Sequence, residues 1–239
     1  MRSGRVPGYL AEKDVPNSAV LSAPPPAPGS AAQANDDEIS RKYLAMQGTA
    51  RWQLATQDAV LTFPLAVDTF SCALNAPVSE KEMPVLYSLL RKSLTDAGRS
   101  TGFAKSLYKR QRPFMVNGKP MCTPDYEQIL RNDGSYPSGH SAAGSAWSLI
   151  LAEISPGQAQ AILARGRAFA QSRLVCNVHW YSDTVEGMAM GAATVARLHA
   201  DPVFESDLAK AKQELAAVRA KGLPVTRDCA GEAAALGGE

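Results

Sequence analysis

The stretch that decides the fold class is PSGHSAAGSAWSLILAEI, residues 137–154, together with DTVEGMAMGAATVARLHA, residues 183–200. Both stretches are apolar at their centres and rich in alanine and glycine, which allow helices to approach one another closely. A membrane-spanning helix needs about 20 consecutive apolar residues, and neither stretch reaches that length. We therefore predict two tightly packed, buried helices and no membrane association.

Helix signals continue on both sides of these stretches, whereas the alternating pattern typical of strands is scarce. Residues 79–82, Ser-Glu-Lys-Glu, form a capping-box pattern that predicts a helix start. Residues 114–136 are rich in Gly, Asn, Pro and Asp and are predicted as a loop. We predict an all-α helical bundle with further helices over residues 35–57, 79–94, 101–111, 156–172 and 204–221.

Prolines set the N-terminal part apart from the rest of the chain. Pro7, Pro16, Pro28 and the run Pro24–Pro26 all fall within residues 6–34. Proline lacks a backbone N–H and fixes φ, so this density opposes helix formation and favours an extended or polyproline II path. We predict an extended Pro-rich arm over residues 1–34, lying on one helical domain over residues 35–239.

Composition limits the partners that the protein can have. Its 25 basic and 23 acidic residues give a net charge of +2, which lacks the clustered basic excess of proteins that bind nucleic acid polymers. The first residues turn polar after Met1–Gly4 and do not resemble a secretory signal. This pattern indicates either a cytoplasmic protein or a mature form whose leader has been removed.

Four cysteines, at positions 72, 122, 176 and 229, are widely spaced and form no CxxC pair. That spacing argues against a zinc site. The even number allows two disulfides with three connectivities in an oxidising compartment, but four small buried thiols would fit the composition equally well.

Three short segments concentrate residues suited to phosphate chemistry. Each alone is weak, since a Lys and an Arg seven residues apart usually mark a solvated helix face. Their strength lies in their order and spacing. The segments are Lys105-(six residues)-Arg112-Pro113, Pro137-Ser138-Gly139-His140, and Ser172-Arg173-(five residues)-His179-(three residues)-Asp183.

Together the three segments match the signature of the superfamily that joins type-2 phosphatidic acid phosphatases, bacterial class A non-specific acid phosphatases and vanadium haloperoxidases. Residues 8–10, 16–18 and 24–32 resemble the class A acid phosphatases specifically. The resemblance implies a metal-independent enzyme without a cofactor, acting on many phosphomonoesters and sometimes transferring phosphate to alcohols or nucleosides. It also implies inhibition by vanadate, a homodimer, and a periplasmic or secreted location after leader removal.

The residue types fit a tetrahedral oxyanion on their own chemistry. Phosphoryl transfer spreads negative charge over the equatorial oxygens, so catalysis depends mainly on positioning and charge stabilisation. Arginine offers a planar fork for two oxygens and lysine a point charge. A Ser and Gly at a helix start add a hydroxyl and backbone N–H groups. We expect phosphate to be bound by Lys105, Arg112, Ser138, Gly139 and Arg173.

Two of the three histidines in the chain fall within the signature. The resemblance implies that His179 attacks phosphorus and forms a phosphohistidine. Asp183 would accept a hydrogen bond from the other ring nitrogen, and His140 would protonate the leaving group. His199, late in a predicted helix, is interpreted as a C-terminal cap without a catalytic role.

Three alternatives remain at this point. A vanadium haloperoxidase would use the same residues to hold vanadate, with His179 as the axial ligand; the short chain and the N-terminal resemblance argue against it. A membrane lipid phosphatase is disfavoured because no segment is long enough to span a bilayer. A non-catalytic phosphate-binding module would not need the pair His140 and His179.

Overall fold

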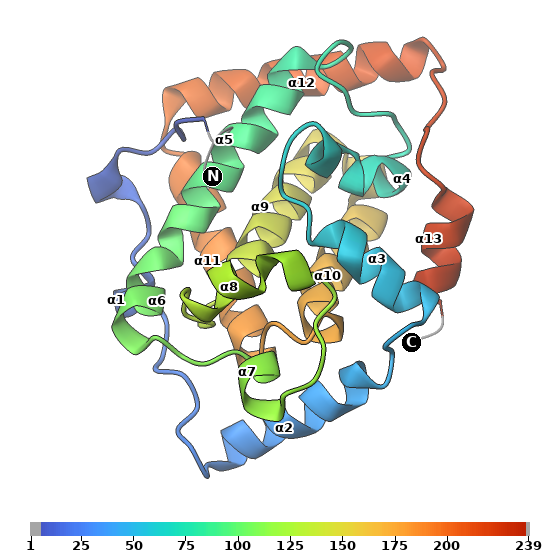
Figure 1. Cartoon of the computed structure of the whole chain (residues 1–239). Helices are drawn as coiled ribbons and strands as arrows, with labels where there is room; N and C mark the ends of the chain where they lie inside the picture. Colours follow the sequence, from blue (N-terminus) through green and yellow to red (C-terminus); the bar gives the residue numbers. More distant parts are fainter. Residues whose placement is uncertain (1–5, 238–239) are drawn as a thin grey trace.

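Three long helices form the centre of the molecule: α9 (Gly139–Ile154), α10 (Ala159–Val175) and α11 (Tyr181–Leu198). In the computed structural model, which describes residues 6–237, the long helices α5 (Pro84–Ser100) and α12 (Pro202–Ala220) pack beside this centre (Figure 1). The described part of the chain contains no strand. The prediction of an all-α fold is confirmed.

Shorter helices surround this centre. A second layer made by α2, α3 and α13 covers α10. The short elements are η1 (Glu12–Asp14), α1 (Ser18–Leu21), α2 (Ala31–Leu44), α3 (Ala50–Asp58), η2 (Leu65–Phe70), α4 (Ser71–Leu74), α6 (Gly102–Tyr108), α7 (Pro113–Asn117), η3 (Pro124–Tyr126), α8 (Glu127–Arg131), η4 (Pro156–Gln158) and α13 (Cys229–Leu236).

Glycines allow α9 and α11 to pack almost backbone to backbone. A Cβ atom on Gly191 would collide with the carbonyl oxygen of Ala142, and one on Gly187 would collide with the carbonyl of Ser138. The close approach expected from the small residues in these two stretches is therefore present. No helix among residues 6–237 is long and apolar enough to cross a membrane.

The main hydrophobic core lies between α5, α9, α11 and α12. Trp147 of α9 is 2% exposed, and its indole N–H donates to the carbonyl of Leu90 at 2.9 Å. Aromatic rings of Phe63, Phe70 and Phe169 surround it at centroid distances of 6.1–6.4 Å. Trp147 thereby fixes α9, which carries part of the candidate site at its first turn, against α5.

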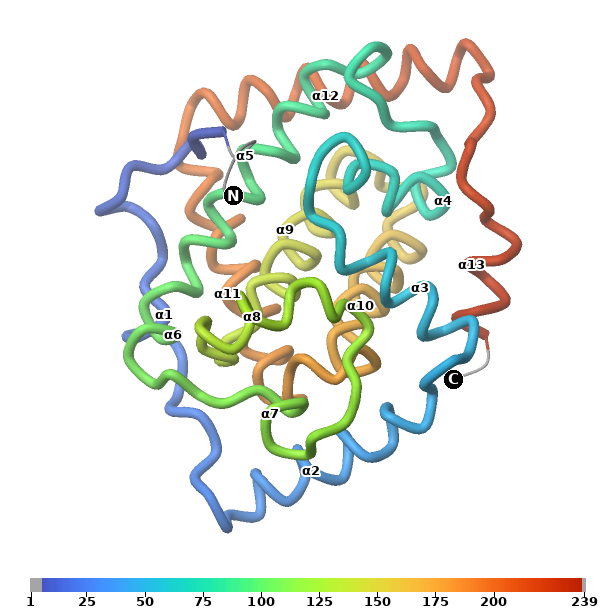
Figure 2. The backbone as a smooth tube through the Cα atoms, viewed as in Figure 1, coloured from blue at the N-terminus to red at the C-terminus, as the bar shows by residue number. Residues whose placement is uncertain are grey.

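The N-terminal segment lies along α5 and α6 (Figure 2). The backbone N–H of Tyr9 donates to Asp96 at 2.8 Å, and the N–H of Ala104 donates to Ser18 at 3.0 Å. The prolines do not exclude every helical turn, because α1 forms within the arm. Residues 1–5 of the predicted arm lie outside the described residues.

Several predicted helix boundaries were wrong. One helix over residues 35–57 is two helices, because Gly48 has a φ of +80° and separates α2 from α3. α2 starts at Ala31, where Ser30 caps it by accepting from the N–H of Gln33 at 3.2 Å. It therefore crosses the boundary predicted between residues 34 and 35.

Other differences fall near the candidate site. The helix expected over residues 101–111 ends at Tyr108, since Lys109 adopts a left-handed φ of +46°. The loop predicted over residues 114–136 contains α7, η3 and α8. The helix predicted from Ser79 begins only at Pro84, a residue suited to the first helical position because it needs no N–H partner.

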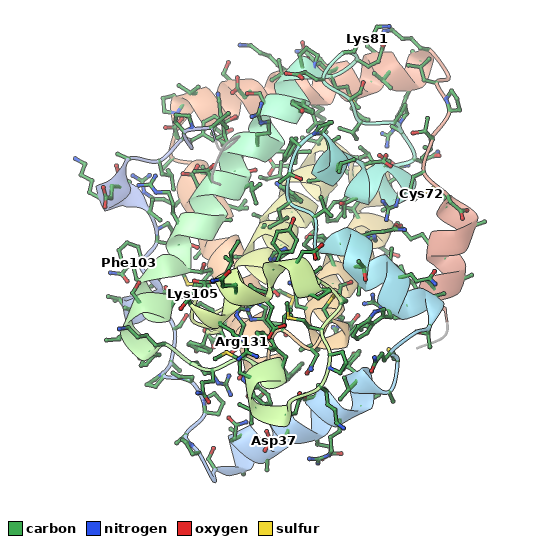
Figure 3. The ribbon with its side chains drawn as sticks, in the orientation of Figure 1. Asp37, Cys72, Lys81, Phe103, Lys105 and Arg131 are labelled. Carbon is green, nitrogen blue, oxygen red and sulfur yellow. A yellow bond between two sulfur atoms is a disulfide. The ribbon has the colours of Figure 1, made fainter. Side chains whose placement is uncertain are left out.

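Two disulfides settle the alternative that the cysteine count left open. Cys122 pairs with Cys176, and Cys72 pairs with Cys229 (Cys72 is labelled in Figure 3). The Cys72–Cys229 bond closes 157 residues of chain and fastens α13 to α4. The Cys122–Cys176 bond fastens the segment after α7 to the end of α10.

We predict that Gly191→Ala lowers the free energy of unfolding by about 1–3 kcal/mol, because overpacked helices must separate. Gly98→Ala is the matched control: Gly98 lies within α5, and a Cβ there would meet no atom within 4 Å. Alanine at such a helical position should raise stability by about 0.5–1 kcal/mol. Urea denaturation of both variants checks this, and equal effects would contradict the packing described.

Candidate active site

The first turns of α9 and α11 meet, and this contact brings two of the three signature segments together. Ser138 is the N-cap of α9 and accepts from the N–H of Ser141 at 3.2 Å. The backbone N–H of Ser138 donates to the carbonyl of Asp183 at 2.9 Å. Asp183 lies in the first turn of α11 and accepts from the N–H of Trp180 at 2.8 Å.

A tight turn after α10 places His179 beside Arg173. Asn177 has a φ of +59°, and the N–H groups of Val178 and His179 both donate to the carbonyl of Arg173, at 3.2 and 3.3 Å. This turn explains the spacing of five residues between Arg173 and His179.

The ring of His179 is buried, and its contacts define its tautomer. Nε2 lies 3.0 Å from Nη1 of Arg112. A guanidinium group only donates, so Nε2 is the acceptor and carries no proton. Nδ1 then carries the proton and lies 3.2 Å from Oδ2 of Asp183. Burial, together with the charges of Arg112, Lys105 and Arg173, lowers the pKa of His179 well below its usual value and keeps the ring neutral.

The carboxylate of Asp183 is completely buried and accepts from two residues that sequence reasoning missed. Ser135 donates its hydroxyl in a short hydrogen bond, and Arg110 donates from Nη1 at 2.7 Å. Arg110 also pairs with Asp36 of α2 at 2.8 Å. Both missed residues stand within three positions of a signature residue, and that nearness was the only signal in the sequence.

Arg112 and Lys105 converge on one carboxylate that was not predicted. Asp133 lies 3.0 Å from Nη2 of Arg112 and 2.9 Å from Nζ of Lys105. Arg112 is almost fully buried and also donates to the carbonyl of Val178 at 3.0 Å. Burial lowers the pKa of Lys105 to about 8, and the charge of Arg112 acts in the same direction. Lys105 is therefore cationic at acidic and neutral pH.

Arg173 is buried yet incompletely paired. Its side chain is 2% exposed, and among the described residues neither Nε nor Nη1 has a hydrogen-bond partner. A buried cation with unsatisfied donors is costly unless an anion binds to it. Burial first, and then the charge of Arg112, lowers the pKa of Arg173 to about 9. Arg173 therefore has donors that can bind an oxyanion.

His140 lies in the first turn of α9, and one of its ring nitrogens is hydrogen-bonded to the end of α3. Nε2 lies 3.0 Å from the carbonyl of Ala59; because a carbonyl only accepts, Nε2 carries a proton. The ring stacks on Phe169 at a centroid distance of 6.4 Å. Burial and the charge of Arg173 lower its pKa well below the usual value. Nδ1 is the ring nitrogen left to exchange a proton.

Gly139, between Ser138 and His140, has no neighbour that demands a glycine. A Cβ there would meet only Oγ1 of Thr101, at the ordinary distance of 3.5 Å. Its backbone belongs to the first turn of α9, where N–H groups are free to bind an anion. The close approach of a ligand to this backbone, expected from the sequence, stays a prediction.

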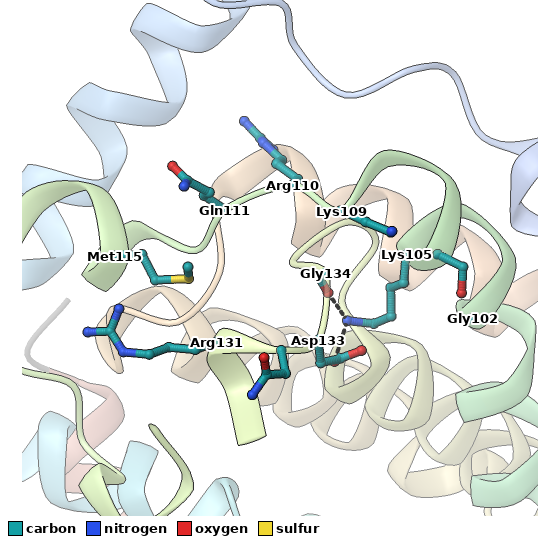
Figure 4. Close-up of a pocket in the computed structure, with 11 residues that line it drawn as sticks. Gly102, Lys105, Lys109, Arg110, Gln111, Met115, Arg131, Asp133 and Gly134 are labelled. Atoms are coloured by element: carbon teal, nitrogen blue, oxygen red, sulfur yellow. Dashed lines mark hydrogen bonds and ion pairs between the residues drawn. The ribbon is translucent and has the colours of Figure 1, made fainter. Parts of the chain in front are cut away.

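A cavity of about 560 Å³ opens beside these residues (Figure 4). Lys105, Asp133 and Gly134 are among the residues that line it, whereas Arg112, His140 and His179 are not. Among residues 6–237, no cluster of three His, Cys, Asp or Glu side chains is arranged to hold a metal ion. Away from the site, His199 ends α11 and pairs with Glu205.

Comparison with known proteins places the chain in a family. The model of the PAP2 superfamily matches residues 81–205. An acid phosphatase of Zymomonas mobilis is 39% identical over 197 residues, which cover 82% of this chain and 75% of the relative. Non-specific acid phosphatases of Salmonella typhimurium and Providencia stuartii are each 38% identical, covering 87% and 88% of this chain and 84% and 86% of the relatives.

The matched region contains all three signature segments, and the relatives extend the likeness over most of the chain. The chain therefore belongs to the PAP2 superfamily and, within it, to the bacterial non-specific acid phosphatases.

Proposed function

We propose that this protein is an acid phosphatase that hydrolyses phosphomonoesters through a covalent phosphohistidine at His179. The observation that carries the proposal is the tautomer of His179, whose unprotonated Nε2 lies among three cationic side chains. A neutral, buried imidazole beside cations is a suitable nucleophile for a phosphate ester, because the cations attract the anion. The lone pair of Nε2, which accepts from Nη1 of Arg112 in this structure, becomes available when Arg112 donates to the phosphate instead. The names of the relatives support the same activity.

Substrate binding rests on the cations. The unsatisfied donors of Arg173 can bind the phosphoryl oxygens directly, and Arg112 and Lys105 can add charge-assisted hydrogen bonds. The first turn of α9 adds the hydroxyl proton of Ser138, the backbone N–H of Gly139 and the positive end of the helix dipole.

In the first step, Nε2 of His179 attacks phosphorus and the bond to the ester oxygen breaks. Asp183, already bonded to Nδ1–H, stabilises the positive charge that develops on the ring. His140 supplies a proton from Nδ1 to the departing alkoxide. In the second step, water gives a proton of its own to His140 and attacks phosphorus, the bond between phosphorus and Nε2 breaks, and phosphate and neutral His179 are released. An alcohol in place of water would accept the phosphoryl group instead.

The two disulfides support export to an oxidising compartment, and we propose a periplasmic or secreted location. Homodimerisation stays a prediction from the resemblance.

To test the reaction class, we expect the wild type to release phosphate from p-nitrophenyl phosphate and to show no halide oxidation with vanadate and peroxide. Vanadate alone should inhibit. His179→Ala should lose at least about 10⁴-fold in kcat, and rapid quenching should trap a phosphorylated His179 in the wild type only. Peroxidase turnover without phosphate release would contradict the proposal, and full activity of His179→Ala would refute the assignment of the nucleophile.

A general acid at His140 predicts a dependence on the leaving group. His140→Ala should lower kcat by about 10²–10⁴-fold for alkyl phosphates, and much less for p-nitrophenyl phosphate, whose leaving group needs little protonation. The acid must be protonated, and burial holds its pKa low in the free enzyme. Wild-type kcat/KM should therefore fall as pH rises through a value below about 6.5, and this limb should vanish in the variant. Equal losses for both substrates would contradict the role.

Asp183→Asn tests the tautomer. The amide oxygen can still accept from Arg110. The NH2 group that then takes the place of Oδ2 loses the hydrogen bond from Trp180, but it can donate to Nδ1 of His179 and move the ring proton to Nε2, where it blocks attack. We expect kcat to fall by about 10²–10⁴-fold, while the inhibition constant of phosphate changes much less. Steady-state kinetics with circular dichroism as a folding control checks this, and a kcat within twofold of wild type would disprove it.

A further inference from the structure

We propose that the carboxylate of Asp133 is an internal competitor for the phosphate site, which an incoming anion must displace from Lys105 and Arg112. This inference rests on the proposed function, because that function assigns the same two cations to substrate. It adds a residue that sets the affinity of the site for substrate and for released phosphate.

The first observation is that one carboxylate occupies both cations. Oδ2 of Asp133 lies 2.9 Å from Nζ of Lys105 and 3.0 Å from Nη2 of Arg112 (Figure 4 draws the bond to Lys105). A phosphate oxygen bound to both cations would need the same donors, so carboxylate and phosphate cannot both keep these bonds at full strength.

The second observation is the environment of this carboxylate. Its side chain is 48% exposed, whereas the side chains of Lys105 and Arg112 are 11% and 1% exposed. It lies in the short segment between α8 and Ser138 and lines the cavity of about 560 Å³. A half-exposed side chain at a cavity wall can turn toward solvent without opening the core, unlike the buried Asp183.

The third observation is that backbone carbonyls of residues 130–134 also accept hydrogen bonds from Arg112 and Lys105. The carbonyls of Leu130 and Asp133 accept from Nε of Arg112 at 3.0 and 3.2 Å. The carbonyl of Gly134 accepts from Lys105 in a short hydrogen bond. These bonds hold the two cations in place when the carboxylate leaves, so displacement removes the competitor and retains the positioning.

The charges of the residues that line the cavity show that Asp133 is the main local source of repulsion for an anion. It is the one acidic residue among those that line the cavity, against Lys105, Lys109, Arg110 and Arg131. Figure 3 shows Lys105 and Arg131 on the same face of the molecule. Arg110 is already paired with Asp36 and Asp183, and Arg131 with Glu127. An anion that enters the cavity therefore meets Lys105 and Lys109 and, among the lining residues, a single carboxylate that opposes its binding.

An anion can bind only to those molecules in which Asp133 has left Lys105 and Arg112. The dissociation constant of every such anion is therefore raised by the same factor, which is one divided by the fraction of these molecules. Two ion pairs with a half-exposed carboxylate are worth a modest amount. We therefore expect removal of the charge in Asp133→Asn to lower the inhibition constants of phosphate, vanadate and sulfate together, by roughly tenfold.

The experiment measures these three inhibition constants against p-nitrophenyl phosphate hydrolysis for the wild type, Asp133→Asn, Asp133→Glu and Asp125→Asn. Asp125 is an exposed acid of η3, eight positions earlier, and gives the matched change of charge away from Lys105 and Arg112. We expect the Asp125 variant to match the wild type, and Asp133→Glu, which retains the competing carboxylate, to stay within about threefold of it.

Inhibition constants that are unchanged or higher in Asp133→Asn would overturn the inference, since they would mean that the carboxylate does not compete or that it helps to bind anions. Factors that differ widely among the three anions would overturn it as well. Failure of the proposed function is recognised separately, because then the wild type itself would not hydrolyse p-nitrophenyl phosphate.

Discussion

A completely buried carboxylate, that of Asp183, accepts from His179, Ser135, Trp180 and Arg110 at once. Taking such a charge out of water is costly unless its hydrogen bonds are all made. Those bonds require the start of α11, the segment before α9 and the end of α10 to meet at one point. Through Arg110 and Asp36 the requirement extends to α2. The position of His179, the nucleophile that we propose, and much of the surrounding fold are therefore specified by the same group.

The cations around His179 impose the opposite demand. Lys105, Arg112 and Arg173 lie close together away from water and repel one another. Burial lowers the pKa of Arg112 and of Arg173, which shows that their charged forms are disfavoured. A protein selected only for stability would pair each of them fully. Arg112 and Lys105 instead share the half-exposed Asp133, and Arg173 keeps unsatisfied donors. Charged side chains with incomplete pairing are expected at a site where a ligand supplies the missing partner.

The sequence predicted what local chemistry controls. Ser138 caps α9, as serines at helix starts commonly do. The signature residues could be named because their spacing matches the family that the chain resembles, and the turn at Asn177 accounts for part of that spacing. Ser135, Arg110 and Asp133 could not be predicted, since their roles depend on partners far along the chain. The pairing of Cys72 with Cys229 was left open among three connectivities, because it is a contact across 157 residues. The division of α2 from α3 was missed, because it depends on the backbone of a single glycine, Gly48.

The binding of an anion would change the state of both His140 and Asp133, and this links the two proposals. Burial and the positive charge of Arg173 disfavour a protonated His140 in the free enzyme. A phosphate group bound to Arg173 would cancel that charge and favour protonation of the acid. The same phosphate would displace Asp133, removing one negative charge from the site as it brings its own. The general acid is then charged mainly when an ester is present to receive its proton, so the electrostatic state needed for catalysis is completed by the substrate and not stored in the folded protein.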